Sequence, residues 1–211
     1  MRTHTITTYS AAELKAQFPD GFARALESHV NYVHECGVPW QEECFDSLKG
    51  IIDAAGLALR DYELTYGWGR SFIKVDSPYN DFYEDDPLEI SGSRAVAWLE
   101  NNLFGQFRIP WKLNKKYLKY NTHYTDKSLR PYSPGKVEPC PITGVCYDED
   151  YLDHLVRSVR SGDTIREAFN GLASVYQSIM ETEYEHETSE ESFLEMAKSN
   201  EWEYTASGRQ L

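Results

Sequence analysis

The chain has 211 residues, of which 41% are hydrophobic, and this length is enough to bury one core of ordinary size. Its 21 Lys and Arg face 34 Asp and Glu, and the net charge of −13 excludes a histone-like or polybasic membrane protein. No apolar run approaches the roughly 20 residues of a membrane span, and the opening MRTHTITTYS lacks the apolar stretch of a secretory signal. We therefore expect one cytoplasmic domain whose four cysteines are free thiols.

Helices are predicted for most of the first 56 residues. Ser10 stands three residues before Glu13, which is the spacing of a capping box, so a short helix begins there and ends near Pro19. Two amphipathic stripes follow at helical intervals: Phe22, Ala25, Leu26, His29, Val30 and Val33, then Cys44, Leu48, Ile51, Ile52 and Ala55. We expect these two helices to pack as a helical hairpin.

A β-hairpin is predicted over about 57–76, because β-forming residues dominate on both sides of the GWG turn at 67–69. With the helix pair it completes an N-terminal module over 1–76. The next stretch, 77–89, holds two prolines and five acids and is typical of a loop. A helix is then expected over about 93–104.

The second half of the chain divides into an irregular segment and a helical layer. Residues 105–147 carry five prolines and no sustained period, which indicates a surface excursion. Over 148–211 we expect a helix at 148–159, a second helix that is capped by Asp163 or Thr164 and reaches about 180, and a third over 189–199. WEYT at 202–205 is typical of a short strand that joins the hairpin. The prediction is an α+β fold, with a small antiparallel sheet packed against five or six helices in a single domain.

Positive charge is concentrated in the irregular segment. Residues 105–136 hold eight basic side chains and one acidic one, so they carry +7 and the remaining residues carry −20. Cations interleaved with aromatic rings are typical of single-stranded nucleic-acid binding, and the alternative is a solvated loop. The candidate nucleic-acid residues are Arg108, Trp111, Lys112, Lys115, Lys116, Tyr117, Lys119 and Tyr120.

Acidic side chains gather in two other places. An array of carboxylates can occupy a groove built for a nucleic-acid backbone, because such a groove responds to negative potential. The alternative for each cluster is a solvated surface. The candidate partner-binding residues are Asp81, Glu84, Asp85, Asp86 and Glu89 in the first cluster, and Glu181, Glu183, Glu185, Glu187, Glu190 and Glu191 in the second.

Metal and nucleophile patterns are weak. His29, His34, Cys36 and Cys44 lie within sixteen residues, and Cys140 and Cys146 are separated by five, but structural zinc sites use shorter spacings. GWGRS lacks the spacing of a phosphate-binding loop. We expect no metal, no cofactor and no enzymatic activity. A metal-dependent or thiol enzyme stays a third alternative, because the fold could bring Cys140, Cys146 and the acidic loop together in space.

The segments YSAAELKAQFPDGFARALESH and WQEECFDSLKGIIDAAGLALRDYEL resemble the N-terminal module of small tailed-phage proteins called antitoxins of toxin–antitoxin stability systems. The resemblance covers about a third of the chain and implies a phage or prophage origin. By class it implies a protein that binds the basic surface of a bacterial host or immune protein, as anti-CRISPR and anti-restriction proteins do. The second hypothesis is a single-stranded nucleic-acid binder or antitoxin-type regulator that uses the basic aromatic segment.

Overall fold

The chain forms two compact units, which we describe separately. The computed structural model describes residues 7–65, 69–78, 86, 88–104, 109–110, 129–130, 142–143 and 147–211. Unit 1 comprises Met1–Gln41 with Met180–Leu211, and unit 2 comprises Glu42–Ile179. None of the helices in these described ranges is long and apolar enough to cross a membrane. Whether the two units fold as the single expected domain stays a prediction.

Unit 1 is built on three helices, α1 (Ala11–Gln17), α2 (Pro19–Cys36) and α8 (Glu190–Ser199). The predicted capping box begins α1, and Pro19 at the first turn of α2 suits a position that needs no N–H donor. Contacts between α1 and α2 and between each of them and α8 enclose one core. The core consists of Ala11, Leu14, Phe22, Ala25, Phe193, Ala197 and Tyr204.

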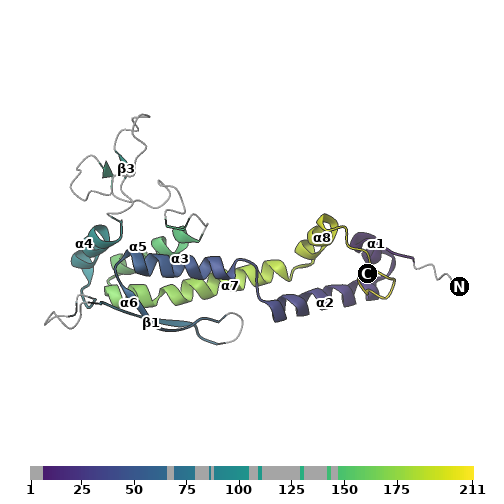
Figure 1. The fold of residues 1–211 in the computed structure, drawn as a ribbon, viewed down its shortest axis with the longest axis horizontal. Helices are drawn as coiled ribbons and strands as arrows, with labels where there is room; N and C mark the ends of the chain where they lie inside the picture. Colours follow the sequence, from purple (N-terminus) through teal and green to yellow (C-terminus); the bar gives the residue numbers. More distant parts are fainter. Residues whose placement is uncertain are drawn as a thin grey trace. The chain divides into compact units, whose positions relative to one another are not determined.

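The C-terminal segment of unit 1 packs closely on α2. Tyr204 forms antiparallel bridges with both Tyr9 and Gln210, and its ring lies 6.1 Å from that of Phe193. A Cβ added at Gly208 would lie 2.1 Å from the backbone oxygen of Gly21, and Gly208 has φ +90°. Figure 1 marks the C-terminus beside α1, as these contacts require. Of the expected 202–205 strand, Tyr204 forms β-bridges, and its described partners, Tyr9 and Gln210, both belong to unit 1.

Unit 2 contains the hairpin and the longer helical layer. Strands β1 (Ala58–Glu63) and β2 (Phe72–Asp76) pair antiparallel, with a register shift between Leu59 and Asp61. Its helices are α3 (Gln41–Ala54), α4 (Gly92–Asn102), α5 (Asp148–Ser161), α6 (Ile165–Asn170) and the first half of α7 (Leu172–Glu187). A second strand pair joins β3 (Ile109–Pro110) to β4 (Leu129–Arg130). The expected α+β class with a small antiparallel hairpin is confirmed.

Two helical predictions differ from the structure. The stripes at 22–33 and 44–55 both form helices, but α2 packs with α1 and α8 while α3 belongs to unit 2. The single helix expected over 164–180 is interrupted at Gly171, where a Cβ would lie 2.5 Å from His154 Nε2. Thr164 is the residue that caps α6, through a second capping box with Glu167. The sequence pattern did not predict that His154 of α5 packs against Gly171.

Candidate functional site

The described part of the first acidic cluster is paired inside unit 2. Arg166 Nε donates to Glu89 at 2.6 Å, and its Nη2 donates to Asp86. The same guanidinium donates to the Val75 carbonyl at 2.8 Å, so one side chain joins α6, β2 and the 86–90 segment. Both carboxylates are therefore ion-paired to one guanidinium within unit 2. Asp81, Glu84 and Asp85 lie outside the described residues.

The second acidic cluster lies in unit 1, on the last turns of α7 and the first turn of α8. Glu185, Glu190 and Glu191 are exposed, and the other three members, Glu181, Glu183 and Glu187, are half-buried. Glu190 forms an ion pair with Lys15. The Glu187 carbonyl accepts a hydrogen bond from His29 Nε2 at 3.0 Å, and this bond fixes the α7–α8 junction against α2. The structure therefore brings the cluster together on the surface of one unit.

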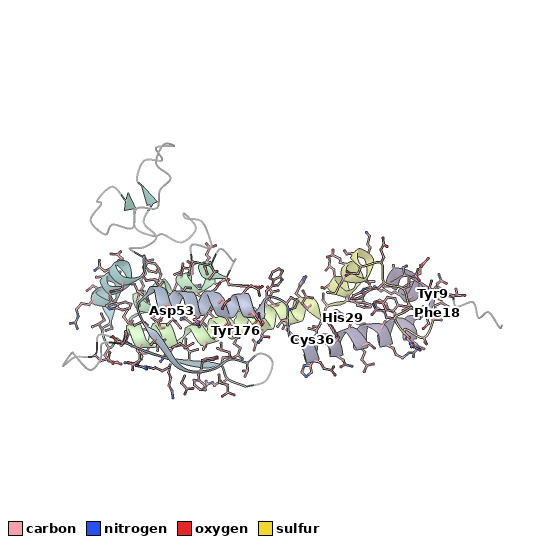
Figure 2. All side chains as sticks on the ribbon, viewed as in Figure 1. Tyr9, Phe18, His29, Cys36, Asp53 and Tyr176 are labelled. Atoms are coloured by element: carbon pink, nitrogen blue, oxygen red, sulfur yellow. The ribbon has the colours of Figure 1, made fainter. Side chains whose placement is uncertain are left out.

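A cavity of about 750 Å³ opens beside this cluster, between the start of α1 and the end of α8. Tyr9, Leu194 and Trp202 form its apolar wall and also pack against the core of unit 1. Figure 2 shows Tyr9 beside Phe18, and their ring centroids are 4.9 Å apart, which anchors this wall. The polar lining is Thr8, Ser10, Glu13, Glu195, Lys198, Glu201 and Glu203.

The charge of this cavity is strongly unbalanced. Among the described lining residues, four side chains are carboxylates and Lys198 is the single cation. The Ser10 backbone N–H and, to a smaller extent, its hydroxyl donate hydrogen bonds to the Glu13 carboxylate, and both lower the pKa of Glu13. Within the described part of the chain, the carboxylates of Glu195, Glu201 and Glu203 take part in no ion pair. The cavity is an apolar hollow with an unneutralised acidic rim.

Glu201 reaches this rim from an unusual backbone conformation. It follows the last turn of α8 with φ 53°, and the Trp202 N–H donates to the Ala197 carbonyl at 2.9 Å. The Glu201 N–H donates to the Lys198 carbonyl at 3.3 Å, which completes the hydrogen-bond pair of a Schellman motif. Glycine is the usual residue at this left-handed position, since it carries no Cβ. Glu201 therefore places a carboxylate at the cavity from a left-handed position that glycine usually occupies at the end of a helix.

The described zinc candidates form no metal site. His29 and Cys36 belong to unit 1, whereas Cys44 belongs to unit 2 and contacts the Tyr151 hydroxyl at 3.0 Å. Burial, with Cys44 beside it, raises the pKa of Tyr151 well above its usual range. No group of three His, Cys, Asp or Glu in the described ranges could hold a metal ion. Cys140 and Cys146 lie outside the described residues.

The candidate nucleic-acid residues also lie outside the described residues. They are Arg108, Trp111, Lys112, Lys115, Lys116, Tyr117, Lys119 and Tyr120. Of the 105–136 segment, the structure describes only the backbone of β3 and β4. Binding of single strands through this segment stays a prediction.

Sequence reasoning missed the cavity and its residues. Glu195 lay in a predicted helix, and Trp202 and Glu203 in a predicted strand, so nothing in the pattern placed them beside Tyr9. The available signal was composition, because nine of the residues in 180–211 are glutamates. Comparison of the chain with protein-family models, curated proteins and solved structures finds no match.

Proposed function

We propose that the chain is a stoichiometric binding protein that takes a basic surface of a partner protein on the acidic face of unit 1. The observation that carries this proposal is the set of exposed carboxylates at the α7–α8 junction. Glu185 near the end of α7, and Glu190 and Glu191 at the start of α8, supply them. Unit 1 has 13 acidic and five basic residues, so it carries −8. Negative potential of this kind steers association with a basic groove and sets its salt dependence.

The basic side chains of unit 1 are in part already engaged. Lys15 pairs with Glu190, and Arg24 Nε donates to the Ser207 carbonyl at 2.8 Å. Glu185 and Glu191 are exposed and project from different helices. Exposed carboxylates on two elements present negative charge of the kind to which a nucleic-acid-binding groove responds. We infer that the partner is a bacterial nucleic-acid-processing or defence protein, which the chain inhibits by occupying its groove.

The proposal is tested by capture from host lysate at low and high salt, with the recovered protein identified and then assayed after purification. Wild type is compared with a variant that carries Glu183→Gln, Glu185→Gln and Glu187→Gln. The matched control neutralises three exposed acids of unit 2 with Asp46→Asn, Asp53→Asn and Glu100→Gln. Loss of partner inhibition in the first variant alone supports the proposal.

Three outcomes overturn it. Recovery of no specific partner at low salt is one, and equal inhibition by both variants is another. The third is retention of labelled single-stranded nucleic acid by the wild-type chain with no protein partner, which favours the binder that uses the basic aromatic segment. A filter-binding assay measures this directly.

A further inference from the structure

We propose that the cavity between residues 8–13 of the α1 region and residues 194–203 binds a basic linear segment of the partner protein, with an Arg or Lys side chain inserted. This inference deepens the proposed function and rests on it for the class of partner, a protein. It concerns residues that the two predicted acidic clusters do not include, namely Glu195, Glu201 and Glu203.

The chemistry of the wall favours a long cationic side chain. Tyr9, Leu194 and Trp202 present apolar and aromatic surface, on which the alkyl stem of Arg or Lys can lie. The positive head group then meets the carboxylate rim, and an indole face adds attraction for a cation. An acidic ligand is disfavoured because, of the described lining residues, Lys198 alone is basic and four are acidic. A purely apolar ligand would leave the carboxylates without a counter-charge.

The rim and the α7–α8 acidic segment are connected through one helix. Glu191 and Glu195 are both exposed and lie four residues apart on α8, so they share a face of that helix. Glu195 lines the cavity, whereas Glu191 belongs to the predicted cluster. A partner guided by the cluster therefore has a continuous path of negative charge to the cavity. A cavity of about 750 Å³ has room for more than one side chain, which suits an extended segment.

Two alanines on α1 give a matched pair of variants. Ala12 lines the cavity and is exposed, whereas Ala16 is exposed one turn later and is not part of the lining. Lysine is a good helix former at both positions. Ala12→Lys puts a positive charge and extra volume into the cavity, and Ala16→Lys adds the same charge outside it. Neither substitution removes a core side chain.

Glu201→Gly separates a binding role from a structural one. Glycine relieves the left-handed conformation at φ 53° and deletes one carboxylate from the rim. The variant should bind basic ligands more weakly while its Tm does not fall. A residue with only a structural role cannot show both effects, because a loss of affinity through misfolding lowers the Tm.

The experiment measures fluorescence anisotropy of a short labelled peptide of arginine and leucine, titrated with the full chain at about 0.05 and 0.5 M salt. Controls are a peptide with glutamate in place of arginine, and spermidine as competitor. We expect the basic peptide to bind and the glutamate peptide not to bind. The affinity of the basic peptide should fall about tenfold for Ala12→Lys and for the double variant Glu195→Gln with Glu203→Gln, and several-fold for Glu201→Gly. Its affinity for Ala16→Lys should stay within about twofold of that for wild type.

Each contrary result has a definite reading. Equal affinities of Ala12→Lys and Ala16→Lys overturn the cavity as the site. Complete displacement of the peptide by spermidine shows a general polycation attractor and overturns the protein segment as ligand. Peptide binding that fails while partner capture still depends on Glu183, Glu185 and Glu187 overturns this inference and leaves the proposed function standing. If the unit 2 control variant (Asp46→Asn, Asp53→Asn and Glu100→Gln) loses partner capture while peptide binding is intact, the proposed function alone is overturned.

Discussion

Carboxylates of the 86–90 segment in unit 2 and of the cavity rim in unit 1 have opposite surroundings. Asp86 and Glu89 share the guanidinium of Arg166, whose side chain is 29% exposed. Glu195 and Glu203 are exposed and have no ion pair within the described residues. The first pair holds a hairpin, a segment and a helix together, and the second leaves its charge available to a ligand. Acid content alone therefore does not locate an interaction surface.

The largest effect is expected for Gly208→Ala, which disrupts the packing of the C-terminal segment on α2. The added Cβ would lie 2.1 Å from the Gly21 oxygen, and alanine is strained at φ +90°. We expect a loss of about 3 kcal/mol in the free energy of unfolding. Hydrogen exchange should show loss of protection in α1, α2 and α8, with unit 2 retained.

Gly56→Ala is the matched control for Gly208→Ala. Gly56 also has positive φ, at +71°, but nothing lies within 4 Å of an added Cβ. Only the backbone strain applies there, and its cost is about 1 kcal/mol. Equal destabilisation by the two substitutions would contradict the close approach of the C-terminal segment to α2.

Arg166→Ala removes the common partner of the two unit 2 carboxylates. Asp86 and Glu89 lose their counter-charge and the Val75 carbonyl loses a donor, so we expect a loss of about 2 kcal/mol. Adding Asp86→Asn should restore part of this loss, because the unpaired charge is then gone. Urea unfolding of the single and double variants measures the coupling, and strictly additive effects would show that the ion pair contributes nothing.

His154 gives unit 2 a pH dependence. Burial is the main cause that lowers the pKa of His154 below 6.5, and Arg157 adds to it, whereas the Ala168 carbonyl and Asp163 oppose it. The unfolded chain therefore binds a proton more readily than the folded one, and stability falls as the pH drops through 6.5 and below. His154→Gln should flatten this part of the curve. Thermal melts of the wild type and this variant from pH 7 to 5 measure the difference.

The smallest effect is expected for Glu195→Gln with Glu203→Gln. These side chains have no ion pair to lose within the described chain, so the free energy of unfolding should stay within about 0.5 kcal/mol of wild type. Chemical denaturation checks this expectation. A loss comparable to that of Arg166→Ala would mean that the rim carboxylates are structural, and it would remove the contrast between the two regions.

Local features were the predictable part of this molecule. The Ser10 capping box, the α2 and α3 stripes, the hairpin and the end of α5 before Gly162 follow from interactions within a few residues, and the structure contains all of them. The break at Gly171 was not predictable, because it depends on His154, which is seventeen residues earlier. The candidate site was predictable only in its acidic character.

The sequence by itself determined which segments are helices, where the charge is concentrated and that an antiparallel hairpin forms. Periodicity, caps and turn residues act over one or two turns, so they can be read without knowledge of the fold. Tertiary structure decided which carboxylates are ion-paired, because Arg166 meets Asp86 across 80 residues of chain. It also decided that Tyr9 and Trp202 line one cavity, since long-range packing brings together residues whose spacing in the sequence carries no signal.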